Sequence, residues 1–133
     1  MLGHLGVNVT DLRVAKAYYD RLMPLLGYAP YRDDPDQFAY RPANQQPGPA
    51  IFFYPALQAG PFSRHCPGLQ HLAFVVESRS AVHTVHTTAL ELGSEIIHPP
   101  QLFPQYRPHY YAVFWYDPEG FMLEALCLRP DPS

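Results

Sequence analysis

The sequence predicts an α+β fold made of two βαβββ modules, and two observations carry this prediction. The first is a repeated transition from a strand-like segment to the start of a helix, which we call a joint. Residues 3–9 lead into Thr10-Asp11-Leu12, and residues 70–76 lead into Glu77-Ser78-Arg79. Both strand-like segments contain a histidine, and the two histidines lie about half a chain length apart. The second is that each joint precedes a helical pattern and then three further strand-like segments. Such a half-chain repeat indicates two copies of one supersecondary unit.

The first module is expected to occupy residues 1–56. Residues 3–9 are apolar and rich in β-branched side chains, which predicts a strand, and Thr10 is the expected N-cap of the next helix. The apolar face of this helix is Ala15, Tyr18, Tyr19, Leu22 and Leu26. Pro24 should end it early, before Gly27 releases the chain. Further strands are predicted at residues 28–33, 37–41 and 50–54, with a loop at 44–49.

The second module, residues 69–129, is expected to follow a linker at 57–68 and to complete a single domain spanning residues 1–133. A strand is predicted at 69–77, and a helix at 80–92 that Gly93 closes. A short strand at 94–98 precedes a loop at 99–108, which is long enough to suggest a functional role. Strands at 110–116 and 121–128 are joined by a turn over Asp117-Pro118-Glu119-Gly120.

Composition excludes several classes of function. The chain is 47% hydrophobic and 16% charged, which predicts a globular protein rather than a disordered one. A net charge of -3 gives no electrostatic basis for binding nucleic acid. No apolar stretch approaches the roughly 20 residues of a membrane span, and we expect no signal peptide. Cys66 and Cys127 are the only cysteines, so we expect two free thiols and a cytoplasmic protein.

Three residues are suited to hold a divalent metal. His4 and His71 occupy matching places in the repeat, and Glu124 follows in an apolar strand-like run. Imidazole and carboxylate groups ligate divalent transition metals, and alternation along a strand lets each face one side of its sheet. Two simpler interpretations stay open: the histidines as hydrogen-bonded core residues, and Glu124 as a strand-end salt bridge. A buried carboxylate without a partner is costly, which favours a metal or a cation beside Glu124.

The second-half loop contributes further candidates. His109 could act as a general acid or base, and Tyr111 could donate a hydrogen bond to a developing oxyanion. Tyr106 and Tyr110 are candidate substrate contacts, and Arg107 could pair with an anionic group of the substrate. The alternatives are packing for the tyrosines and exposure to solvent for Arg107 and His109. In the first half, Phe53 could line an apolar ligand site or pack in the core.

These motifs resemble those of the vicinal oxygen chelate superfamily, which includes glyoxalase I, extradiol dioxygenases, fosfomycin-resistance proteins and bleomycin-binding proteins. The matching segments are His4 in the first strand, Gln70-His71-Leu72-Ala73-Phe74, and Asp117-Pro118-Glu119-Gly120-Phe121-Met122-Leu123-Glu124-Ala125. The resemblance implies two βαβββ modules that form a cupped mixed β-sheet with flanking helices. It also implies one divalent metal ion (Fe, Mn, Zn or Ni) on His4, His71 and Glu124, with Glu124 part of the catalytic site.

One departure from the family pattern concerns the last strand of the first module. In glyoxalase I this strand supplies a ligand, whereas here it has no carboxylate, and Phe53 aligns roughly with Glu124. The resemblance therefore implies three protein ligands and a metal-dependent enzyme, a lyase, isomerase, transferase or oxygenase, acting on a small oxygenated substrate. The alternative is a non-catalytic, bleomycin-resistance-like binder of a small ligand. Homodimers are common in the superfamily, so a homodimer is an expectation.

Overall fold

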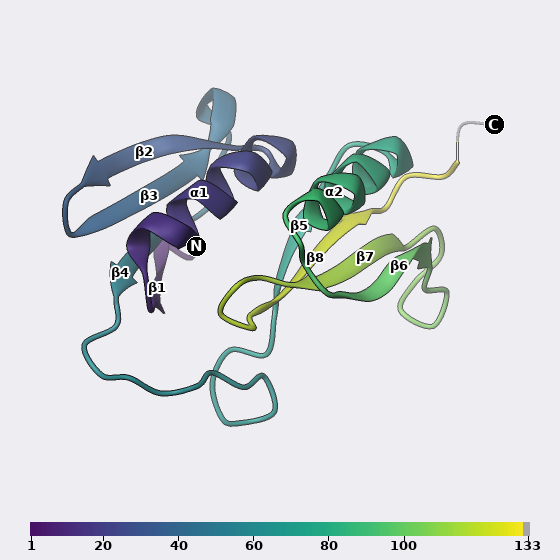
Figure 1. The fold of residues 1–133 in the computed structure, drawn as a ribbon. Helices are drawn as coiled ribbons and strands as arrows, with labels where there is room; N and C mark the ends of the chain where they lie inside the picture. Colours follow the sequence, from purple (N-terminus) through teal and green to yellow (C-terminus); the bar gives the residue numbers. More distant parts are fainter. Residues whose placement is uncertain (132–133) are drawn as a thin grey trace. The chain divides into compact units, whose positions relative to one another are not determined.

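The computed structural model describes residues 1–131, and within them the chain divides into two compact units, residues 1–61 and the residues from Phe62 onward. Each unit combines an α-helix with a four-stranded sheet (Figure 1). Among the described residues, no helix is long and apolar enough to cross a membrane. Both cysteines are free thiols, with Cys66 exposed and Cys127 buried.

The first unit has the order of elements that the sequence predicts. Its elements are β1 (His4–Val9), α1 (Leu12–Leu22), η1 (Met23–Leu26), β2 (Tyr28–Asp34), β3 (Gln37–Pro42), η2 (Ala43–Gln45) and β4 (Ala50–Pro55). The sheet order is β1-β4-β3-β2, with β1 parallel to β4 and the other pairs antiparallel. Pro24 lies in η1 directly after α1, so the α-helix ends where the proline predicted.

The second unit repeats this arrangement. Its elements are β5 (Leu72–Val75), α2 (Arg79–Glu91), β6 (Ile96–Leu102), β7 (Tyr111–Tyr116) and β8 (Met122–Cys127). The sheet order is β5-β8-β7-β6, again with the first pair parallel and the others antiparallel. The predicted fold class, an α+β fold of two βαβββ modules, is therefore confirmed.

Three local predictions differ from the structure. The N-cap of α1 is Asp11 rather than Thr10, because the Asp11 carboxylate accepts hydrogen bonds from the backbone N–H groups of Arg13 and Val14. Strand β5 is shorter than residues 69–77, so His71 lies directly before the strand. Strand β6 extends to Leu102, which takes in part of the loop expected at 99–108.

Each sheet packs one face against its own helix. In the first unit Phe53 is buried and its ring lies 4.6 Å from that of Tyr19 in α1. In the second unit the Tyr111 hydroxyl is hydrogen-bonded to Nε2 of His83 in α2 at 2.7 Å. Because side chains alternate along a strand, Phe52 and Phe114 point to the opposite faces of their sheets. We call the face opposite α1, or opposite α2, the open face of that sheet.

Candidate metal centre

Glu124 and His71 meet on the open face of the second sheet. Glu124 lies in the middle of β8, opposite Phe114 of β7 and Ala73 of β5, and is 1% exposed. Its Oε1 is 3.3 Å from Nε2 of His71, whose side chain is 37% exposed. The carboxylate is thus buried in the strand, while the imidazole reaches it from the start of β5. Both predicted ligands of this unit therefore converge.

Gln70 contacts the ring of His71. Oε1 of Gln70 contacts Nδ1 of His71, and because an amide oxygen only accepts, Nδ1 carries the proton in this contact. Nε2 of a neutral ring then presents a lone pair to the Glu124 carboxylate. Two facing acceptors repel unless a proton, on the ring or on the carboxyl group, or a metal ion lies between them. The same arrangement, with Nδ1 donating to a neighbour, orients metal-bound histidines in general.

The donor atoms of this pair fit a divalent metal. A divalent metal binds imidazole nitrogen and carboxylate oxygen at about 2.0 to 2.2 Å. When the angle between the two bonds at the metal is about 90° to 110°, the nitrogen and the oxygen lie roughly 3.0 to 3.4 Å apart. The 3.3 Å between Nε2 of His71 and Oε1 of Glu124 lies in this interval. Within either unit, residues 1–131 hold no group of three His, Cys, Asp or Glu side chains placed for a metal. The pair therefore supplies two of the three ligands that the resemblance implies.

Tyr110 completes the surroundings of Glu124. Its hydroxyl donates a hydrogen bond of 2.5 Å to Oε2, the carboxylate oxygen that does not face His71. Burial raises the pKa of Glu124, while the Tyr110 hydrogen bond and the nearby His71 ring favour the ionised form. Burial and the carboxylate together raise the pKa of Tyr110 above its ordinary value, so the phenol remains a donor. A cation bound at Oε1 would offset the cost of the buried charge.

His4 is the remaining predicted ligand and lies on the open face of the first sheet. It is exposed, and its ring contacts the ring of Phe52 with centroids 5.2 Å apart. Gly3 precedes it where Gln70 precedes His71, so His4 lacks an equivalent side-chain partner. His4 thus has the exposure that a ligand needs, without the polar support that the second unit gives to His71.

Strand register corrects the expected counterpart of Glu124. Ala73 pairs with Glu124 in the second sheet, and Gly6, its equivalent by the repeat, pairs with Phe52. Phe52 rather than Phe53 therefore occupies the place of the missing acid. Phe53 is 2% exposed and packs against Phe38 and Tyr19, so it belongs to the core beneath α1 and does not line a ligand site.

The structure separates the candidates of the second-half loop. Tyr106 is exposed and its ring lies 5.2 Å from that of Tyr110, so both belong to the surroundings of Glu124. Tyr111 points to the α2 face and is not brought together with Glu124. Arg107 and His109 are exposed in the loop, where His109 has a left-handed backbone with φ of 64°.

His98 and Phe52 lie on the open faces of their sheets near a predicted ligand, and Gln70 directly precedes His71. The His98 ring contacts that of Phe114, which in turn contacts the ring of His71. Proximity to His71 in sequence could have indicated Gln70, whereas Phe52 becomes evident only from the pairing of β1 with β4. His98 is placed by β6, whose extent the sequence understated.

Replacing Tyr110 with phenylalanine is expected to weaken metal binding about ten- to a hundredfold, the usual cost of losing a partner that orients a ligand. The variant keeps the ring and removes only the hydroxyl that donates to Glu124. Competition with a fluorescent chelator measures the affinity. Tyr111→Phe is the matched control, since it removes a hydroxyl from the opposite face of the same sheet. Equal affinities in the two variants would contradict the role given to Tyr110.

Two βαβββ modules, each a mixed four-stranded sheet with one α-helix, are the fold that the resemblance to the vicinal oxygen chelate superfamily implies. Comparison with solved structures confirms this assignment of the fold, as the resemblance predicted. The chain has the fold shared by glyoxalase, bleomycin-resistance and dioxygenase proteins. A scan against protein-family models and a search of curated proteins each gave no match.

Three of the similar structures illustrate the range of this class. A candidate glyoxalase from Bacillus halodurans is 29% identical, with 96% of this chain and 95% of that chain covered and a TM-score of 0.78. A glyoxalase/bleomycin resistance protein from Albidiferax ferrireducens is 25% identical, with 98% and 99% covered and a TM-score of 0.76. The fosfomycin resistance protein FosX from Listeria monocytogenes is 18% identical, with 96% and 92% covered and a TM-score of 0.67.

Proposed function

We propose that the protein is a divalent-metal-dependent enzyme that acts on a small oxygenated substrate, with His4, His71 and Glu124 as the metal ligands. The observation that carries this proposal is the contact between the buried carboxylate of Glu124 and Nε2 of His71. A buried carboxylate and an imidazole lone pair that face each other at ligand spacing are suited to share a cation. His4 joins them by its equivalence to His71 in the repeat.

The residues around the pair have separate tasks in this proposal. Gln70 holds the proton on Nδ1 of His71, which keeps Nε2 free to bind, and Tyr110 fixes the orientation of Glu124. The metal, Fe, Mn, Zn or Ni, would act as a Lewis acid toward adjacent oxygens of the substrate. His98 lies on the same face and could act as a general acid or base. Lyase, isomerase, transferase and oxygenase reactions are each compatible with these residues.

A non-catalytic binder is the second candidate, and one observation favours it. Phe52 stands where an acid would be expected, and its ring stacks at 6.2 Å with that of Tyr54, so the open face of the first sheet is aromatic. Aromatic surfaces bind planar ligands without any chemistry. Turnover assays with a panel of oxygenated substrates and added metals would separate the two functions, because only the enzyme consumes substrate.

Metal analysis tests the proposed site. The parent protein, purified without chelator, is expected to contain about one equivalent of a divalent metal, because the three proposed ligands form one site for a single ion. His4→Ala and Glu124→Ala are expected to lose most of it, while His65→Ala, which removes an exposed histidine outside the site, retains it. If His4→Ala and Glu124→Ala hold as much metal as the parent, the ligand assignment is wrong.

A further inference from the structure

A row of aromatic contacts leads away from His4 across the open face of the first sheet. The ring of Phe52 lies 5.2 Å from that of His4 and 6.0 Å from that of Tyr31, both in edge-on geometry. The guanidinium of Arg41 follows, 4.7 Å from the centre of the Tyr31 ring. We call His4, Phe52 and Tyr31 the aromatic row. It connects the proposed metal ligand to a cation within one unit.

Arg41 differs from the arginines that have ion pairs. Arg32 pairs with Asp34, and Arg129 pairs with Glu77. No carboxylate among residues 1–131 pairs with Arg41, whose contact is the face of Tyr31. Stacking on an aromatic ring holds a guanidinium in place and leaves its N–H donors open. Arg41 is therefore an oriented, exposed cation without a neutralising anion in the described part of the chain.

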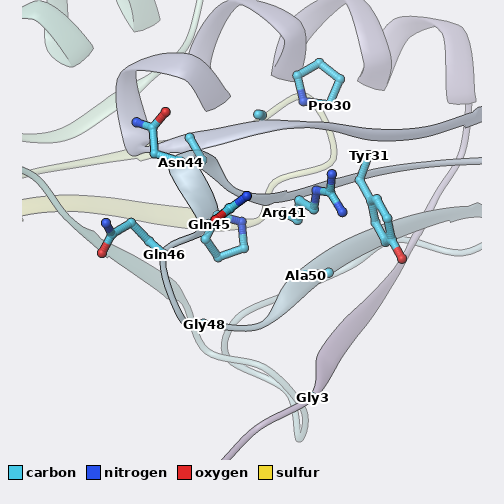
Figure 2. Close-up of a pocket in the computed structure, with 12 residues that line it drawn as sticks. Gly3, Pro30, Tyr31, Arg41, Asn44, Gln45, Gln46, Gly48 and Ala50 are labelled. Atoms are coloured by element: carbon cyan, nitrogen blue, oxygen red, sulfur yellow. The ribbon is translucent and has the colours of Figure 1, made fainter.

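A cavity of about 550 Å³ opens beside Arg41, between the β2–β3 hairpin and the segment before β4. Figure 2 shows Arg41 and Tyr31 along one part of it, and the amides of Asn44, Gln45 and Gln46 along another. Ala50, the strand partner of His4, also lines it, so the cavity borders the proposed ligand. Its volume is in the range of small-molecule sites.

The amide segment has an uncommon backbone. Asn44 and Gln45 both have φ of 57°, in the left-handed region that residues other than glycine seldom adopt. Such conformations are strained and gather at ligand sites, where the surroundings enforce them. Asn44 and Gln45 both line the cavity, so their side-chain amides add hydrogen-bond donors to a wall that also contains Arg41.

We propose that this cavity binds the carboxylate end of the substrate, with Arg41 as the recognising cation and the aromatic row as the surface for a planar or apolar body. This inference rests on the proposed function, because it assigns the substrate class of the same metal site: an aryl carboxylate or a close equivalent. A guanidinium matches a carboxylate with two parallel hydrogen bonds, and the amides add neutral donors. A further aromatic ring could pack on the exposed side of this row in an offset or edge-to-face arrangement.

Binding of phenylacetate, compared with its neutral analogue phenylacetamide, tests the inference. The full chain is titrated at millimolar concentrations of each probe with a chelator present, so that no carboxylate is held by a metal, and backbone amide shifts are followed by NMR. Phenylacetate is expected to bind about tenfold more tightly or better, the size that charge-assisted hydrogen bonds confer. The largest shifts are expected at Tyr31 and Arg41.

Arg41→Gln should abolish the preference for phenylacetate, while Arg32→Gln, which removes a paired arginine of the same hairpin, should preserve it. Absence of phenylacetate binding, equal binding of the two probes, or a preference that survives in Arg41→Gln would each overturn the inference. These outcomes leave the proposed metal site standing, because metal content is measured separately on His4→Ala and Glu124→Ala. Conversely, loss of the metal assignment does not alter the titration.

Discussion

Replacing Glu124 with glutamine is expected to abolish stabilisation of the fold by added metal. The substitution keeps the shape of the side chain and removes the charged oxygen beside Nε2 of His71. The parent should gain about 2.7 kcal/mol of unfolding free energy when free metal exceeds the dissociation constant about a hundredfold. The variant should gain little, because losing a ligand costs more affinity than the ten- to hundredfold lost with an orienting partner.

Without metal, the same substitution should stabilise the fold increasingly as pH rises. Burial raises the pKa of Glu124, so the folded chain keeps a proton that the unfolded chain has released. The contribution of Glu124 to the stability of the metal-free parent is therefore fully present below the ordinary pKa of glutamate, and it is lost as pH rises through the raised pKa. Glutamine stays neutral throughout, so the advantage of Glu124→Gln over the parent grows across that window.

Urea unfolding of parent and variant, with metal and with chelator, measures both effects. Glu95→Gln is the control, since it neutralises an exposed glutamate of the same unit. If the metal stabilises Glu124→Gln as much as it stabilises the parent, Glu124 is not a ligand. If the metal-free variant loses stability relative to the parent as pH rises, then the neighbours of Glu124 stabilise its ionised form by more than burial destabilises it.

Phe53→Ala is expected to lower the free energy of unfolding by about 3 to 5 kcal/mol, the usual loss for a phenylalanine removed from a core. Phe53 is 2% exposed and stacks with Phe38 at 4.7 Å, beneath α1. Phe52→Ala is the matched control, because the neighbouring side chain lies partly exposed on the open face and its removal leaves a smaller cavity. Urea unfolding of the two variants gives the comparison.

An equal or larger loss for Phe52→Ala would contradict the division into a core face and an open face. It would also remove the argument that Phe52, and not Phe53, holds the position equivalent to Glu124. Loss of ligand binding should follow the reverse order, since Phe52 contacts His4 and Tyr31 while Phe53 contacts neither in the described structure.

The sequence predicts the two βαβββ modules because hydrophobic periodicity and turn residues are local properties. Pro24 and Gly27 mark the end of the first helical segment, and Gly93 follows the second helix with φ of 81°. Boundaries were less certain where neighbours compete. Thr10 and Asp11 both suit an N-cap, and the choice depends on which side chain reaches the first free N–H groups.

The sequence predicts those parts of the site that follow from residue type and from alternation along a strand. Alternation along a strand brought Glu124 to the face that His71 reaches, and the buried carboxylate signalled a partner. Which of two adjacent residues faces the site was not predictable, because a shift of one residue reverses every side chain. This is why Phe52 takes the place first given to Phe53, and why Tyr110 rather than Tyr111 lies beside Glu124. Arg41 gained a role only from its surroundings in space.

Anomalous diffraction from crystals grown with a transition metal tests the central claim most directly. One strong peak is expected at bonding distance from Nε2 of His71 and from the carboxylate of Glu124, with a third bond to Nε2 or Nδ1 of His4. An anomalous peak bonded to other side chains would contradict the account. So would a crystal that contains one metal ion per chain but shows no anomalous density between His71 and Glu124.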